Sequence, residues 1–168
     1  MDVAALLLDL YGRVPHLVHE AVDGLTADQL LARPSPDANT IAWLVWHLTR
    51  VQDQQLADLI GKQQLYETGD WAGRFGLEAD GADNGYGHST DQVGAVRPDG
   101  PTPLLDYMDA VDEQTSSYLS GLTPDELDRV IDENWDPPVT LGVRLVSVAD
   151  DCLQHAGQAA YIRGLLTS

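Results

Sequence analysis

Two residues near the end of the chain have types and spacing that suit metal binding. Asp151 precedes His155 by four residues, so on a helix the two side chains lie about 40° apart on one face. A carboxylate that projects toward a protein core must be paired or must bind a cation. A basic residue such as Arg50, Arg144 or Arg163 could pair with it, whereas a divalent metal would satisfy the carboxylate and the imidazole together. The face is expected to be buried, because His155 falls within a stripe of apolar residues: Leu141, Leu145, Val148, Cys152, Ala159, Ile162 and Leu166.

His47 is the candidate third ligand, on a separate helical pattern one turn after Trp43. Two histidines and one carboxylate with an open position form the ligand pattern of catalytic zinc sites rather than structural ones. The alternative for each histidine alone is a hydrogen-bonded core residue. We therefore expect His47, Asp151 and His155 to bind a divalent transition metal, with zinc preferred and nickel, manganese or iron as alternatives.

Other histidines and the cysteine are weaker candidates for metal binding or catalysis. His16 and His19 are three apart and could reach one metal, but Pro15 perturbs that turn and no third ligand is evident. His88 is interpreted as a solvated loop residue, with closure over a site as the alternative. Cys152 is turned about 100° from Asp151 around the helix, which favours a small core residue over a nucleophile.

Gln158 lies one turn beyond His155 and could orient a ligand or a bound water. A hydrogen bond between helices is the alternative. The four tryptophans could line a pocket or could simply fill the core: Trp43, Trp46, Trp71 and Trp135. The chain contains no phosphate-binding loop, no dinucleotide-binding fingerprint and no Gly-x-Ser-x-Gly elbow.

Apolar residues that recur every three or four positions predict four long helices, over residues 2–22, 39–60, 103–119 and 140–166. Pro15 is expected to kink or split the first of them. Short helices should begin near Thr26 and Thr123. No run alternates at period two, so the sequence offers no sheet beyond a possible short strand near residues 130–135.

An internal repeat supports a bundle of these helices. Residues 24–30 read GLTADQL and residues 121–127 read GLTPDEL, and each copy follows one long helix and precedes another. Two helical hairpins packed together make a four-helix bundle. The alternative is that Gly-Leu-Thr-x-Asp is merely a common way to begin a helix.

Residues 62–102 are rich in Gly, Asp, Ala and Asn and lack strong periodicity. A segment of that length in a small domain is uncommon and is often functional. It is interpreted as a crossover between the second and third long helices or a lid, with a packed surface loop as the alternative. We expect one all-α domain over residues 1–168.

Composition narrows the classes of partner. Nine Lys+Arg against 27 Asp+Glu give the 168-residue chain a net charge of −18. This charge argues against nucleic acid and against anionic membrane surfaces as partners. One cysteine excludes an intrachain disulfide and a thiolate zinc cluster. The amino terminus lacks a basic signal-peptide region, so a cytoplasmic location is predicted.

Two stretches of the chain resemble the DinB-like superfamily. Residues 39–48 read NTIAWLVWHL and resemble the second helix of these proteins, and residues 150–158 read DDCLQHAGQ and resemble their last helix. In that superfamily the second helix supplies one His, and the last helix supplies His-x-x-x-His followed by x-Gly-Gln. By resemblance, His47 and His155 match ligand histidines, whereas Asp151 stands where the first His of the last helix is usual.

The resemblance implies a metal-binding four-helix bundle, often a homodimer. Members include mycothiol-dependent maleylpyruvate isomerases and bacillithiol S-transferases. The first functional hypothesis is therefore an enzyme that activates a small thiol at a metal for attack on an electrophilic substrate. The alternatives are a metal-dependent hydrolase and a non-enzymatic, stress-related binding or dimerisation module with a degenerate site.

Overall fold

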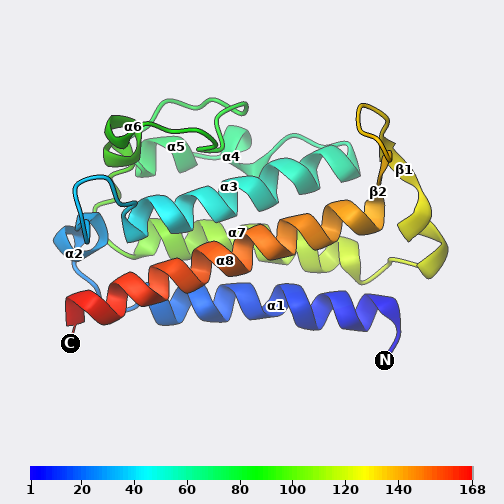
Figure 1. The fold of residues 1–168 in the computed structure, drawn as a ribbon, viewed down its shortest axis with the longest axis horizontal. Helices are drawn as coiled ribbons and strands as arrows, with labels where there is room; N and C mark the ends of the chain where they lie inside the picture. Colours follow the sequence, from blue (N-terminus) through cyan, green and yellow to red (C-terminus); the bar gives the residue numbers. More distant parts are fainter. Residues whose placement is uncertain (168) are drawn as a thin grey trace.

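Four long helices form the body of the molecule (Figure 1). The computed structural model describes residues 1–167, and in it both α1 and α3 pack against α7 and α8. In Figure 1, α3 and α7 run in one direction and α1 and α8 in the other. The predicted all-α four-helix bundle is confirmed. The long helices are α1 (Val3–Val22), α3 (Ile41–Ile60), α7 (Thr102–Leu119) and α8 (Leu141–Thr167).

Both repeated segments form short helices that begin at a threonine. α2 (Ala27–Leu31) starts at Thr26, and η1 (Pro124–Asp128), a 3₁₀ helix, starts at Thr123. Each start is a capping box, in which the side chain three residues later bonds back to the backbone of the cap. The two predicted short helices are thus confirmed.

Pro15 does not split the first helix, which is a correction to that part of the prediction. α1 is one continuous helix through Pro15. A helical proline lacks only its own N–H and leaves one carbonyl of the preceding turn unbonded. Tyr11, Val14 and Val18 on either side are buried in the core, and this packing holds the helix together.

A small antiparallel ribbon closes one end of the bundle. β1 (Val130–Asp132) pairs with β2 (Val139–Thr140), with Val130 opposite Thr140 and Asp132 opposite Val139. The predicted short strand is therefore present. Its partner includes Thr140, which the sequence pattern had assigned to the last helix.

The segment 62–102 crosses from the end of α3 to the start of α7 and covers α3 (Figure 1). It contains three short helices: α4 (Leu65–Thr68), α5 (Trp71–Arg74) and α6 (Thr90–Ala95). Helices of four to six residues are too short to show a periodic pattern. The segment packs into the core through Tyr66, Ala72, Phe75, Val93 and Val96.

α3 is the most enclosed helix because α7, α8 and the crossover all contact it. Its first turn is fixed by the Thr40 side chain, which accepts from the Trp43 N–H, and it ends at Gly61 in a left-handed conformation. Polar residues on its covered face are therefore buried, among them His47, Arg50 and Asp53. Within residues 1–167, no helix is both long enough and apolar enough to cross a membrane.

Candidate metal centre

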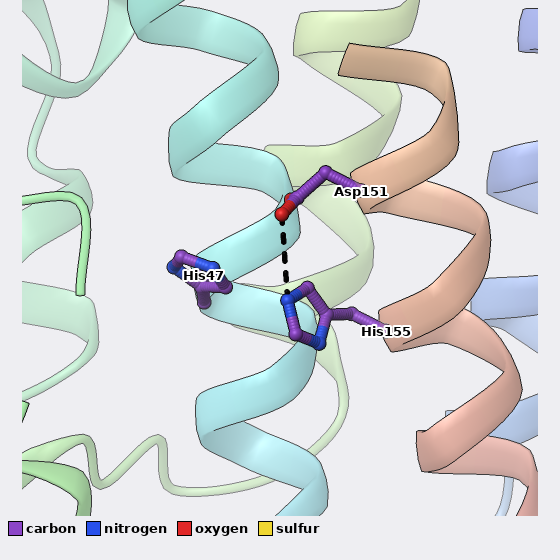
Figure 2. A group of neighbouring side chains, drawn as sticks. All are labelled: His47, Asp151 and His155. Carbon is purple, nitrogen blue, oxygen red and sulfur yellow. Dashed lines mark ion pairs between the residues drawn. The ribbon is translucent and has the colours of Figure 1, made fainter. Parts of the chain in front are cut away.

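The structure brings His47, Asp151 and His155 together between α3 and α8 (Figure 2). One potential ligand atom from each residue lies within 4.8 Å of the others. The ring centroids of His47 and His155 are 4.8 Å apart, and His155 Nε2 lies 3.5 Å from Asp151 Oδ1. Among residues 1–167, this is the one group of three such side chains close enough to share a metal ion.

His47 is held so that one ring nitrogen faces the site. Its Nδ1–H donates a hydrogen bond to the backbone carbonyl of Asn84, in the crossover segment. Because a carbonyl can only accept, Nδ1 carries the proton and Nε2 keeps a free lone pair. Ligating histidines are commonly oriented in this way, by a hydrogen bond at the other nitrogen.

His155 has the same arrangement. Its Nδ1–H donates to Gln158 Oε1 at 3.0 Å, one turn along α8. Nε2 then points toward Asp151 (Figure 2). Gln158 therefore orients a candidate ligand, which is one of the two roles expected of it.

Asp151 keeps an oxygen without a partner. Its Oδ2 is buried and accepts no hydrogen bond from the described residues. None of the three arginines considered as partners pairs with it. Arg50 lies by Asp53, Arg144 by Asp132, and Arg163 donates to the carbonyl of Asp23. A buried carboxylate oxygen without a partner is costly, and a cation at the site would remove that cost.

The two histidines have opposite electrostatic environments. Burial lowers the pKa of His47, although its bond to the Asn84 carbonyl opposes this effect. The bond to Asp151 raises the pKa of His155, against the opposing effect of burial. The lowered pKa keeps His47 neutral near pH 7, which is the form that binds metals.

His88 is not a solvated loop residue, which corrects that interpretation. Its side chain is 8% exposed, and its Nε2–H donates to Asp83 Oδ1 at 2.8 Å. Its Nδ1 accepts from the indole N–H of Trp43 at 3.1 Å. Trp43 in turn stacks on His47, with ring centroids 4.7 Å apart. His88 thus restrains the surroundings of His47 from the crossover.

The remaining candidates lie elsewhere or act structurally. Cys152 is fully buried, and burial raises the pKa of its thiol, as expected of a core residue. His19 pairs with Asp109 of α7 at 3.0 Å, so it serves a contact between helices. Trp46 is buried in the core, whereas Trp135 is 65% exposed.

Sequence reasoning missed the residues that support the site from the crossover. Asn84 acts through its backbone carbonyl, which no side-chain motif can reveal. The available signal was the dipeptide Asn84-Gly85, which is typical of a turn. This dipeptide predicts a turn at residues 84–85, but it does not predict that the turn packs against α3.

Comparisons with known proteins agree with this architecture. A family model described as the DinB superfamily matches residues 10–159. A crystal structure of a conserved protein from Enterococcus faecalis is similar, with a TM-score of 0.88 and 33% sequence identity, over 97% of this chain and 96% of that one. The comparison with curated proteins gives no match. The family match spans most of the chain and includes all three candidate ligands, so the chain belongs to the DinB superfamily.

Proposed function

We propose that this protein is a metal-dependent enzyme that activates a low-molecular-weight thiol, such as mycothiol, for transfer or isomerisation chemistry on an electrophilic substrate. The observation that carries the proposal is the convergence of His47, Asp151 and His155, together with a buried oxygen of Asp151 that has no partner among the described residues. Two imidazoles and one carboxylate favour zinc, with nickel, manganese or iron as alternatives.

The donor set is suited to a catalytic ion. Both imidazoles offer Nε2, because each Nδ1–H is bonded elsewhere. Three protein ligands leave room for an exogenous ligand. A bound divalent ion would supply positive charge that favours the thiolate form of a coordinated thiol.

The chain's own cysteine is a poor source of that thiolate. Cys152 is fully buried, its thiol has a raised pKa, and it faces the backbone carbonyl of Leu48 in the core. A thiolate mechanism at this centre would therefore need a thiol from outside the chain.

A largely apolar pocket begins at Gln158, one turn along α8 from His155, and offers space for part of a substrate. It has a volume of about 480 Å³, and one of its lining residues is Gln158, which also accepts the hydrogen bond from His155 Nδ1–H. Its walls include Leu44, Tyr161 and Ile162. A pocket of this size and character suits the apolar part of a small electrophile.

Elemental analysis of the purified, untagged protein tests the metal. We expect close to one equivalent of a transition metal in the wild type and its loss in His47→Ala and Asp151→Ala. His16→Ala removes an exposed histidine from α1 and is the matched control, which should keep the metal. A wild type without metal after incubation with zinc, nickel and manganese would contradict the proposal and favour a non-enzymatic module.

Titration of the cobalt-loaded protein with mycothiol tests the thiol. We expect a new sulfur-to-cobalt absorption band in the wild type and in His16→Ala. A metal-loaded protein whose spectrum ignores thiols would overturn the thiol chemistry. Hydrolysis of esters or amides without thiol, dependent on His47, would instead assign the hydrolase alternative.

A further inference from the structure

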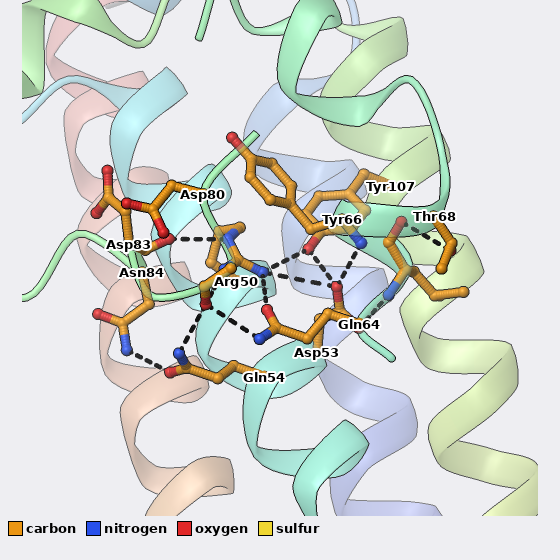
Figure 3. Close-up of polar contacts among 12 residues, drawn as sticks. Arg50, Asp53, Gln54, Gln64, Tyr66, Thr68, Asp80, Asp83, Asn84 and Tyr107 are labelled. Atoms are coloured by element: carbon orange, nitrogen blue, oxygen red, sulfur yellow. Dashed lines mark hydrogen bonds and ion pairs between the residues drawn. The ribbon is translucent and has the colours of Figure 1, made fainter. Parts of the chain in front are cut away.

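Arg50 is a fully buried arginine three residues after His47 on α3 (Figure 3). Its guanidinium lies over the ring of Tyr66, 4.0 Å from the centroid. Nε donates to the carbonyl of Asp83 at 3.1 Å, and Nη2 donates to the carbonyl of Gly81 at 3.1 Å. Nη1 donates to Gln64 Oε1 at 2.8 Å. All three of these donors therefore hold the crossover segment against α3.

Asp53 is the nearest carboxylate to Arg50, but it does not take the donors that bind the crossover segment. Asp53 Oδ2 is 3.7 Å from Arg50 Nη1, beyond a good hydrogen bond. The oxygens of Asp53 accept from the backbone N–H groups of Leu65 and Tyr66 and from the Tyr107 hydroxyl. Asp53 thus fixes the start of α4 and balances the charge of Arg50, while the arginine donors serve residues 81–83.

The segment that Arg50 holds contains both restraints on His47. The carbonyl of Asn84 accepts from His47 Nδ1–H. The Asp83 side chain accepts from His88, and His88 accepts from Trp43, which stacks on the His47 ring. The two restraints therefore begin at consecutive residues, one of which is bonded directly to Arg50.

We propose that Arg50 is a positioning residue for the metal centre. By fixing the backbone at residues 81–83, it places the Asn84 carbonyl so that His47 carries its proton on Nδ1 and offers Nε2 to the site. The consequence for metal affinity rests on the function proposed above. The consequence for the His47 tautomer does not, because it concerns the metal-free chain.

Arg50→Lys tests the proposal, because lysine keeps the charge but lacks the planar fork that reaches two carbonyls at once. Long-range ¹H–¹⁵N spectra of the metal-free protein at pH 8, where His47 is neutral, report its tautomer. We expect Nδ1–H in the wild type and a mixture with Nε2–H in Arg50→Lys. Zinc titration against a chelator should show an affinity about 10- to 100-fold weaker.

Tyr107→Phe is the matched control. It removes the Tyr107 hydroxyl, which donates to Asp53 Oδ2 and accepts a long bond from Arg50 Nη1 at 3.4 Å. It leaves the Arg50 donors to Gly81 and Asp83 in place. We expect a loss of thermal stability with the tautomer and zinc affinity unchanged. An equal loss of affinity in Tyr107→Phe, or an unchanged tautomer in Arg50→Lys, would overturn the proposal.

Gln54→Ala covers the case in which Arg50→Lys fails to fold. Gln54 donates to the Gly81 carbonyl at 3.0 Å and accepts from the Asn84 side chain at 2.7 Å, so its loss should shift the tautomer in the same direction but less. An unchanged tautomer in Gln54→Ala would then count against the proposal. A wild type that binds none of zinc, nickel and manganese, with a tautomer that still depends on Arg50, would refute the proposed function and leave the positioning role standing.

Discussion

At the scale of single residues, the centre pairs two histidines whose protonation is tuned in opposite directions. His155 has a raised pKa because it bonds to Asp151, and His47 has a lowered pKa because it is buried. A raised pKa in the folded state adds stability below the unfolded value near 6.5, and that stability is lost as pH rises through the folded pKa. His47 has the opposite effect, because its lowered pKa makes the folded protein bind this proton less readily than the unfolded chain does. The folded state therefore loses stability as the pH falls below 6.5.

This contrast predicts the titration of the metal-free protein. With a chelator present, the ring Cε1–H signals of His155 should titrate above pH 6.5 and those of His47 below it. Asp151→Asn should lower the pKa of His155, because the carboxylate that stabilises its charged form is gone. NMR titration of both proteins checks this. A His155 pKa below 6.5 in the wild type would contradict the expected role of Asp151.

Some residue roles follow from sequence, and others depend on contacts that sequence does not encode locally. His47, Asp151 and His155 could be grouped because helical spacing and the family resemblance point to the same face. His88 could not be placed, because its partners Asp83 and Trp43 meet only when the crossover folds over α3. The position of Arg50 in the core was equally hidden, because two of its acceptors are backbone carbonyls and its other two lie far along the chain.

At the scale of elements, the turn at residues 84–87 lies directly against the centre. Gly85 has φ +94°, and a Cβ there would lie 2.9 Å from His47 Nδ1 and 2.9 Å from a ring carbon of Trp46. Gly87 also has a positive φ, +76°, but a Cβ there meets nothing within 4 Å. The two glycines therefore share backbone strain on substitution but differ in their contact with His47.

Replacing each glycine by alanine separates the effect of backbone strain from the effect of moving the Asn84 carbonyl. Backbone strain should cost both variants about 1–2 kcal/mol of unfolding free energy, because L residues are disfavoured at positive φ. Gly85→Ala should lose more than Gly87→Ala, because its methyl also meets His47 and Trp46. Only Gly85→Ala should also weaken zinc binding, since the added methyl pushes the Asn84 carbonyl away from His47. Urea denaturation and chelator competition measure the two effects. Equal zinc affinity in both variants would show that the turn does not govern the site.

The elements themselves were predictable where local chemistry marks their ends. The long helices begin and end near the expected residues because caps such as Thr40 and the left-handed Gly61 are local signals. The three helices of the crossover were not predictable, because four to six residues show no period. Continuity of α1 at Pro15 was missed because core packing, and not helix propensity, decides it.

At the scale of the whole molecule, the candidate centre joins two helices that are distant in sequence. His47 belongs to α3, and Asp151 and His155 belong to α8, which packs closely against α3. The net charge of −18 creates a negative field that favours the approach of cations. A metal at this position would link the two helices in the folded state, whereas the unfolded chain holds these ligands far apart.

Metal binding should therefore stabilise the fold by mass action. At a zinc concentration about 100 times the Kd, the gain is about 2.7 kcal/mol. For a chain of this size, that gain corresponds to a rise in Tm of roughly 5–11 °C. Differential scanning calorimetry with and without zinc measures the shift. His16→Ala should show the full rise and His47→Ala none, because only the latter removes a ligand on α3. An equal rise in His47→Ala would show that the stabilising zinc binds elsewhere on this acidic chain. No rise in the wild type would mean that zinc does not link α3 and α8.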